Sequence, residues 1–388
     1  MRRLDVTERR ARLGVRHFLS SPASDPVEAT RGLVVLHATD PASVFLSLYA
    51  RTARVDVGTI ERVLYEDHSL VRMLGMRRTM FVVPVELVPV VQAGATDQIA
   101  ARQLRTYTKL FADAGVGDRN WLVQVADATA RAVAARGEAT GAELSADVPE
   151  LRTQVRTNEG KAYAATQNIT TWVLMLLSMQ GRIVRGRPRG SWVSSQYRWA
   201  PIQSWLPGGM PQVAVEKSRA EIVRRWLAAF GPGTIEDLRW WTGWTLGQVK
   251  LALAGVQPVE VDLDGATGLV LPDDLELTPE PDPWIVFLPA LDSTPMGWTE
   301  RSWYLAEHGT ALFDRSGNIG PTVWSDGRIV GGWGQRPDGE VVYRLLEDVG
   351  ADKADDVVAA ADRLTTWLAG VRVTPRFRTP LERELSAP

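Results

Sequence analysis

The chain has 388 residues, a net charge of −2 and no cysteine, and at roughly 150 residues per domain its length favours two or three domains. The absence of cysteine excludes a disulfide scaffold, a thiol nucleophile, an iron–sulfur cluster and a thiolate zinc site. The four histidines have no metal-binding spacing, so we expect no metal and no cofactor. No apolar stretch approaches the roughly 18 residues of a membrane span and no signal peptide is visible, so we expect a cytoplasmic protein that binds no membrane.

The basic residues are nearly all arginines, since only five of the 44 are lysines. The first lysine is Lys109, so the N-terminal part offers no amine for Schiff-base chemistry. The sequence also lacks a Walker A loop, a Gly-x-Gly-x-x-Gly loop after a strand, a His-Glu-x-x-His pair and a Gly-x-Ser-x-Gly elbow. These absences argue against nucleotide hydrolysis, zinc hydrolysis and α/β-hydrolase chemistry.

The first unit, which we place at residues 1–115, is predicted to be helical before it forms a hairpin. A first helix is predicted to start within residues 6–10, with Thr7 as its N-cap. Apolar residues spaced by three and four predict two further helices, over 27–36 and over 42–51. Asp40-Pro41 fits a helix start, because proline is tolerated at the first helical position. Residues 70–84 then predict two short strands around a tight turn.

The same order recurs in a second unit, at 116–210, and in a third unit, at 211–388. The second unit is expected to have a helix over 167–180 and a strand, turn and strand over 181–193. The third is expected to have helices over 221–230, 234–241 and 245–254, an alternating segment with an Asp-Gly turn over 259–265, strands over 284–291 and 321–333, and a helix over 352–368. Helices followed by a β-hairpin are the plan of a winged helix, so we predict an α+β fold with three tandem winged-helix units.

The strongest charge feature lies in the second predicted hairpin, where residues 182–198 contain five arginines and no acidic residue. Arginines at the tip of a β-turn can enter a minor groove and contact phosphates or base edges. The alternative is a solvated loop that is basic by chance. The candidate DNA contacts are Arg185, Arg187, Arg189 and Trp192 here, together with Arg51, Arg77 and Arg78 in the first unit.

The candidate catalytic residues are His37, Thr39 and Asp40, which lie at an elbow between two predicted helices. Polar residues at such an elbow can project together into a cleft. The alternative is a structural histidine that is hydrogen-bonded by a neighbouring carbonyl or by Asp40. With the ordinary histidine pKa of about 6.5, His37 would be largely neutral at pH 7 and could accept a proton from water.

Several stretches resemble one known family, the AlkZ-like winged-helix DNA glycosylases, and the resemblance covers nearly the whole chain. These stretches are residues 32–51, 78–80, 230–243, 288–292 and 326–333. The resemblance implies three tandem winged helices in a C-shaped arrangement with a β-rich C-terminal part. It also implies that double-stranded DNA carrying alkylated purines is the partner.

The family's catalytic signature is glutamine, an apolar residue, then glutamine or aspartate, and it falls on His37-Ala38-Thr39 here. Both outer positions therefore differ from the family pattern, and Phe81 replaces the family's usual histidine after the Arg-Thr motif. The resemblance implies water attack at the sugar of an N7-alkylguanine. Because that base already carries a positive charge, the reaction needs groups that hold water and stabilise a cationic sugar, but no strong general acid.

The resulting expectation is a monomeric, monofunctional DNA glycosylase that releases bulky N7-alkylguanine adducts, as self-resistance to a genotoxic natural product. Two alternatives remain at this point. One is a lesion-binding or DNA-binding protein that has lost its chemistry along with the family glutamines. The other is a winged-helix transcription regulator, which usually needs a dimerisation element, and the sequence has no heptad seam.

Overall fold

A computed structural model describes residues 1–157 and 165–387 of the chain. Within these ranges no helix combines the length and the apolar character that are needed to cross a bilayer. The same described residues contain no group of three or more histidine, aspartate or glutamate side chains arranged to hold a metal ion. One continuous hydrophobic core runs through all parts of the molecule, and a second, small cluster lies under the strands nearest the N-terminus.

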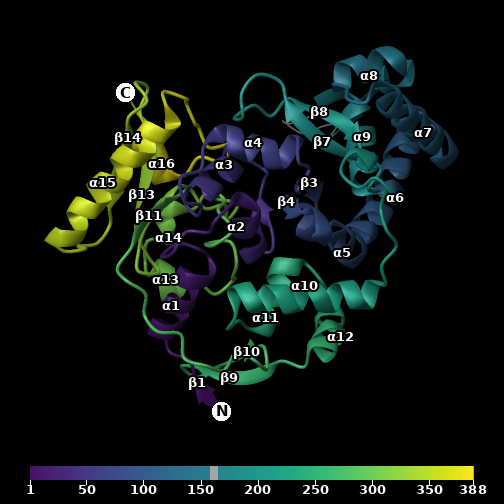
Figure 1. Ribbon diagram of the computed structural model, residues 1–388. Helices are drawn as coiled ribbons and strands as arrows, with labels where there is room; N and C mark the ends of the chain where they lie inside the picture. The colour runs from purple at the N-terminus through teal and green to yellow at the C-terminus, as the bar shows by residue number, and fades with distance from the viewer. Residues whose placement is uncertain (158–164, 388) are drawn as a thin grey trace.

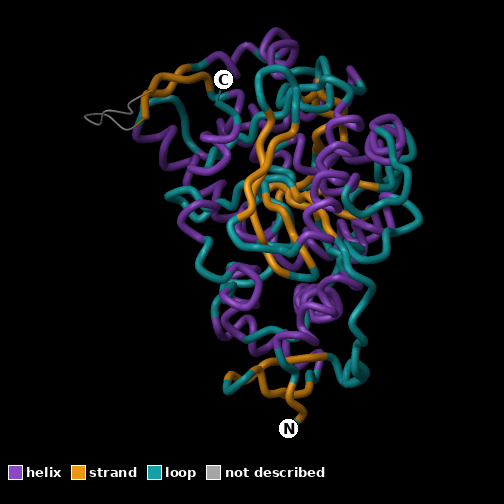
Figure 2. The backbone as a smooth tube through the Cα atoms, turned by 90° about the vertical axis from the view of Figure 1, so that its left-hand side faces the viewer, coloured by secondary structure: helices purple, strands orange, loops and turns teal. Residues whose placement is uncertain are grey.

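Figure 1 shows four parts of the chain in space. Residues 26–84 lie near the top centre, 119–201 at the upper right, 215–270 along the lower side and 285–385 on the left. The two ends of the chain lie far apart, because the N-terminal strand reaches the bottom of the molecule (Figures 1 and 2).

The first 84 residues of the first unit contain four α-helices and a three-stranded sheet. Its elements are α1 (Val6–Arg16), α2 (Pro26–Gly32), β2 (Leu36–His37), α3 (Pro41–Tyr49), α4 (Val57–Tyr65), β3 (Leu70–Leu74) and β4 (Met80–Pro84), and the sheet order is β2-β4-β3. The predicted hairpin over 70–84 and the helix start at Asp40-Pro41 are confirmed. Two details were wrong: Asp5 rather than Thr7 caps α1, and the helix expected over 27–36 ends at Gly32 because residues 36–37 join the sheet.

A short helix, α5 (Val88–Val91), and the long helix α6 (Asp97–Asp113) complete the first unit and lead to the second. The second unit consists of α7 (Arg119–Arg136), α8 (Gly141–Asp147), β5 (Gln154–Thr157), β6 (Ala165–Asn168), α9 (Thr170–Met179), β7 (Ile183–Pro188) and β8 (Tyr197–Pro201). The helix expected over 167–180 begins only at Thr170, because the preceding residues pair with β5. The return strand also begins later than expected, after a loop that continues to residue 196.

The third unit and the C-terminal part complete the fold. Their elements are α10 (Val215–Phe230), α11 (Ile235–Thr242), α12 (Leu246–Val256), β9 (Val259–Leu263), β10 (Ala266–Val270), β11 (Ile285–Leu288), α13 (Ser302–Leu305), α14 (Gly309–Leu312), β12 (Thr322–Ser325), β13 (Arg328–Gln335), β14 (Val341–Leu345), α15 (Ala351–Leu368) and α16 (Pro380–Leu385). Strand β1 (Arg2–Arg3) runs parallel to β9, and β11 to β14 form one antiparallel sheet in chain order. The helices and strands expected in this region are confirmed.

One element order occurs three times along the chain. A helix leads to a short strand or bridge, then to two further helices and a hairpin, and the short strand pairs with the hairpin's second strand. The pairings are β2 with β4, the Ala139–Trp199 bridge and the Gly233–Leu269 bridge. The β5–β6 ribbon is inserted between the last two helices of the second unit and projects from the molecule in Figure 2.

Candidate active site and nucleic-acid interface

His37 ends strand β2 and is fixed by its backbone. It lies opposite Phe81 of β4, whose ring meets the imidazole edge-on at 5.8 Å between centroids. The His37 backbone N–H donates to Ser293 Oγ at 3.0 Å, and the Ser293 hydroxyl donates to the carbonyl of Val35, also at 3.0 Å. A loop of the C-terminal part therefore holds the strand that carries the histidine.

The imidazole lines a pocket of about 90 Å³ at the meeting point of the first unit, the third unit and the C-terminal part. At roughly 30 Å³ per molecule of liquid water, this pocket has room for a few waters. Its lining provides hydroxyl, amide and guanidinium groups but no carboxylate. The described lining residues are Val35, His37, Arg77, Thr79, Phe81, Trp241, Ser293, Met296 and Asn318.

Burial lowers the pKa of His37 to about 4, and the nearby positive charge of Arg77 adds to the effect, while Asp292 opposes it. The ordinary pKa expected from the sequence therefore does not hold. His37 is neutral at pH 7 and stays neutral to about pH 5. Its Nδ1 is buried without a hydrogen-bond partner, so the neutral ring keeps a nitrogen that can accept a proton.

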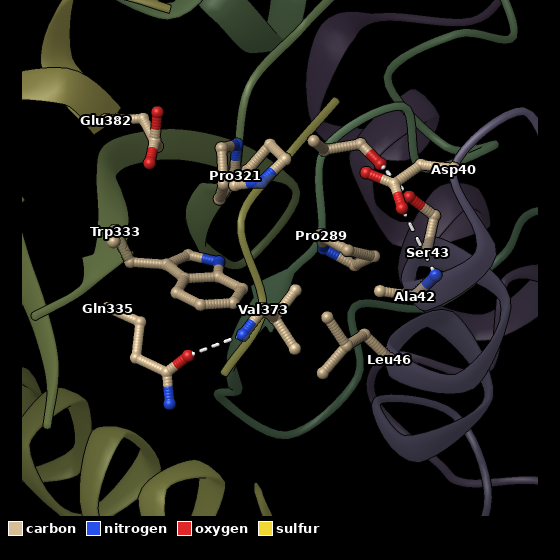
Figure 3. Close-up of a pocket in the computed structure, with 13 residues that line it drawn as sticks. Asp40, Ala42, Ser43, Leu46, Pro289, Pro321, Trp333, Gln335, Val373 and Glu382 are labelled. Carbon is tan, nitrogen blue, oxygen red and sulfur yellow. Dashed lines mark hydrogen bonds between the residues drawn. The ribbon is translucent and has the colours of Figure 1, made fainter. Parts of the chain in front are cut away.

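The structure does not bring Asp40 to His37. The Asp40 carboxylate accepts a hydrogen bond from Ala42 N at 3.2 Å, which caps α3, and a second from Arg376 N at 2.9 Å. Figure 3 shows the side chain at a different cavity, whose other lining residues include Trp333 and Val373. Burial raises the pKa of Asp40, and the two backbone hydrogen bonds oppose this effect.

Thr39, the third candidate of the elbow, is half-buried two residues after His37. The described lining residues of the His37 pocket do not include it, and neither do those of the cavity in Figure 3. Of the three candidate catalytic residues, only His37 therefore lies in the pocket.

Arg51 was expected to contact DNA, and this expectation was wrong, because its side chain is fully buried. Its guanidinium forms two hydrogen bonds to the Asp292 carboxylate, at 2.6 and 2.9 Å, and a third to Thr294 Oγ1 at 2.7 Å. Thr294 in turn donates to Nδ1 of His17 at 2.9 Å, and His17 Nε2 donates to the carbonyl of Ala229 at 3.1 Å. This buried network joins α1, α3, α10 and the loop that holds β2.

The tip of the first hairpin carries Arg77 and Arg78, both exposed and both with positive φ angles, of 55° and 58°. Arg77 lies over the Trp240 ring at 4.5 Å from its centroid. Gly243 packs against the same arginine. A Cβ at Gly243, whose φ is +71°, would approach Arg77 Cγ to 2.9 Å, so a larger residue there would displace the Arg77 side chain. Because Arg77 also lines a groove of about 520 Å³, it lies in a wall shared by the groove and the His37 pocket.

The second hairpin is less available for DNA than its charge suggests. Arg187 forms ion pairs with Glu61 on α4, at 2.9 Å, and with Glu66 just after that helix, at 2.8 Å. Arg185 is half-buried against the rings of Tyr197 and Trp199, and burial lowers its pKa to about 10.

Trp192 of the same loop is a core residue, since it is 5% exposed and packs on Phe45 and Trp367. Its expected DNA contact was wrong. Arg189 is exposed, so it is the one candidate of this hairpin that matches the expected surface position.

Sequence reasoning missed three groups that the structure brings to this region. Ser293 fixes the strand of His37, Asn318 lines its pocket, and Arg102 on α6 lines the groove. The signal for α6 was present, because its buried residues, at 100, 103, 107 and 111, recur at helical spacing. Ser293 and Asn318 lie in loops, where the sequence pattern gives no position in space.

The site therefore combines a neutral histidine, His37, in a small pocket with exposed arginines in an adjoining groove. The family model for AlkZ-like DNA glycosylases matches residues 30–367, and the chain belongs to this family. An interstrand DNA cross-link repair glycosylase of Streptomyces sahachiroi is 30% identical over 186 residues, which are 45% of this chain and 49% of that protein. The chain thus aligns with about half the length of this curated relative.

A solved structure, the DNA glycosylase AlkZ of Streptomyces sahachiroi, matches the overall fold. The TM-score is 0.72 at 20% sequence identity, and the match covers 96% of this chain and 99% of the other. At this level of identity the match shows a shared fold, and the chemistry has to be argued from the residues present.

Proposed function

We propose that this protein is a monofunctional DNA glycosylase that releases N7-alkylguanine adducts from duplex DNA by attack of water at the sugar. The observation that carries the proposal is the place of His37, a neutral base in a pocket with room for a few waters, whose wall is shared with an arginine-lined groove. The family membership supports the reaction type.

The chemistry demands little acid catalysis. An N7-alkylated guanine is already cationic, so its bond to the sugar weakens without protonation of the base. The protein must position a water molecule, accept its proton and tolerate a cationic sugar. A neutral His37 fits the second and third tasks, because it accepts a proton and adds no charge before attack.

The other polar groups of the pocket have supporting roles in this proposal. The Thr79 and Ser293 hydroxyls and the Asn318 amide lie where they can hydrogen-bond a water. Asn318 is itself held by Asp314, since its Nδ2 donates to that carboxylate at 2.8 Å. Asp40 acts at a distance by fixing the start of α3 and so the elbow after β2, while Thr39 contributes at most one hydrogen bond.

A lyase step through a lysine amine has no support. No lysine is present among the described lining residues of the pocket or of the groove, and the first lysine of the sequence is Lys109. Water is therefore the nucleophile, and an abasic site is the product.

The repeated element order supports the interpretation of the three units as winged helices, for which the family resemblance implies an arrangement in a C. In each unit the bridge or short strand joins the hairpin in the same way. The relative named as an interstrand cross-link repair glycosylase supports a bulky, cross-link-forming alkylator as the source of the adduct. On this basis we propose self-resistance as the biological role, carried out by a monomer in the cytoplasm.

Base release from a defined substrate tests the proposal. The purified protein is incubated with a duplex that carries one N7-alkylguanine, and alkali-labile abasic sites are measured. Accumulation of such sites supports a glycosylase. Tight binding of the adducted duplex without strand cleavage after alkali treatment would instead favour the lesion-binding alternative, and preference for one undamaged sequence would favour a regulator.

A further inference from the structure

The groove that shares Arg77 with the His37 pocket lies between α6 and the residues that follow α11. Its described lining contains three arginines, three polar side chains of α6 and no carboxylate. These residues are Arg77, Arg78, Ala95, Gln98, Ile99, Arg102, Gln103, Thr106, Thr242, Gly243 and Trp244. With about 520 Å³, the groove is well above the size of a bound water cluster.

The three arginines of the groove are available to an anion. Arg77, Arg78 and Arg102 are exposed, and none of them forms an ion pair within the described part of the chain. Arg78 donates only to the Gln103 amide oxygen, at 3.2 Å, and Arg77 is held by the Trp240 ring. Cations gathered without neutralising partners create a positive potential that attracts a polyanion.

Helices α4 and α12, which precede the hairpins of the first and third units, fit a phosphate backbone less well. The surface of α4 and the residues just after it carry Glu61 and Glu66, which occupy the guanidinium of Arg187, and Asp67, whose charge would repel phosphates. On α12 the exposed side chains include Leu246 and Leu251, at 40% and 58% exposure. Neither surface offers a set of unpaired cations.

The corresponding helix of the second unit, α9, is largely buried. Six of its ten residues are buried, among them Leu176 and Leu177. The groove along α6 is therefore the better candidate for a phosphate-binding surface.

We propose that this groove binds the phosphodiester backbone of duplex DNA, with Arg102 as a phosphate contact together with Arg77 and Arg78. This inference rests on the proposed function, because it takes duplex DNA as the substrate and names the surface that holds it. Because Arg77 lines both cavities, the phosphate that it binds belongs next to the nucleotide whose sugar faces His37. Helix α6, which links two units, thus sets the position of the duplex.

The first test removes one cation and compares two exposed arginines. In Arg102→Ala the affinity for an undamaged duplex should fall about fivefold, and the dependence of log K on log salt should fall by about one ion. The matched control is Arg131→Ala, because Arg131 is exposed on α7 outside the groove. The control should bind like the wild type with an unchanged salt dependence.

The second test adds a carboxylate at two exposed positions of the same helix. Thr106→Glu places the negative charge in the groove, and the affinity should fall about tenfold at 0.1 M salt. Ala101→Glu places it on α6 at a residue that does not line the groove, and the affinity should stay within about twofold. Circular dichroism of both variants shows whether the helix is intact.

Binding of undamaged duplex is measured apart from base release, so the two proposals can fail separately. A protein without glycosylase activity whose affinity responds to Arg102→Ala and Thr106→Glu would retain the groove assignment and lose the proposed function. An active glycosylase whose affinity and salt dependence are the same in all four variants would overturn the groove. Equal losses in the groove variants and their controls would also overturn it.

Discussion

The hairpins β3–β4 and β7–β8 occupy equivalent places in their units, yet their arginines differ in what they can do. Arg77 and Arg78 at the first tip are exposed and form no ion pair within the described residues. In the second hairpin Arg187 is neutralised by Glu61 of α4 and by Glu66 just after it, and Arg185 is covered by aromatic rings. Availability, and not the number of positive charges in the sequence, therefore decides which hairpin can bind a polyanion.

The first hairpin also differs in its neighbourhood. It lies beside the His37 pocket, because Arg77 lines both that pocket and the groove. The second hairpin packs on α4 and lines a separate pocket with Thr140 and Tyr197. Our two proposals therefore place chemistry and phosphate binding at the first hairpin, while the ion pairs of the second hairpin hold it against the first unit.

The largest expected effect concerns chemistry beside the first hairpin. His37→Ala should slow single-turnover base release about 100-fold or more, since it removes the proton acceptor. DNA affinity should stay near wild type, because the arginines remain. Rates are measured at saturating protein on a duplex with one N7-alkylguanine, and an unchanged rate would remove His37 from the mechanism.

The next effect concerns the buried network that holds the first unit against the C-terminal part. Burial lowers the pKa of His17 to about 3, so between pH 7 and pH 5 only the unfolded chain gains a proton at this residue. Unfolding is therefore favoured as the pH falls, and His17 alone should lower the free energy of unfolding by about 2 kcal/mol at pH 5.

Urea titrations at pH 7 and pH 5 check this expectation. His17→Gln is the matched variant, because its amide can donate to Ala229 O and accept from Thr294 without titrating. The variant should lose less stability between the two pH values than the wild type. Equal losses would show that His17 does not titrate as expected.

A smaller effect concerns the pH dependence of base release, which tests whether Arg77 acts on the pKa of His37. Base release should be independent of pH from 8 to about 5 and should fall as His37 becomes protonated near its pKa of about 4. Arg77→Ala removes a charge that lowers this pKa, so the fall should move to higher pH. The move should be only part of the distance to 6.5, because burial is the larger cause. A fall at the same pH in both proteins would separate Arg77 from His37.

The elbow offers a still smaller contrast. Asp40→Asn should change base release by less than about threefold, because asparagine also caps helices and the carboxylate does not reach His37. Thr39→Ala should cost a few-fold at most, since water can replace one hydrogen bond. A loss in Asp40→Asn as large as in His37→Ala would restore Asp40 to the catalytic group.

Local signals in the sequence were sufficient for much of the fold. Proline after Asp40 marked the start of α3, and the apolar run over 70–84 marked the first hairpin. The elbow also pointed to His37, which lies in a pocket as a candidate site residue should. These features depend on neighbours in the chain, which a sequence pattern can report.

What could not be predicted depends on residues far apart in the sequence. Arg51 can be buried because Asp292, a residue 241 positions away in the sequence, neutralises its charge. Arg187 is likewise neutralised by Glu61, which is 126 positions away. No local pattern around either arginine indicates its partner. The low pKa of His37 likewise comes from burial and from Arg77, which only the folded chain brings near.

The salt dependence of duplex binding tests the contrast between the two hairpins most directly. Affinity for one undamaged duplex is measured at several salt concentrations for the wild type, for Arg77→Ala/Arg78→Ala and for Arg187→Ala/Arg189→Ala. The first double variant should lose about two released ions, and the second at most about one, because Arg187 is already paired and only Arg189 is free. A larger loss in the second double variant than in the first would contradict the account.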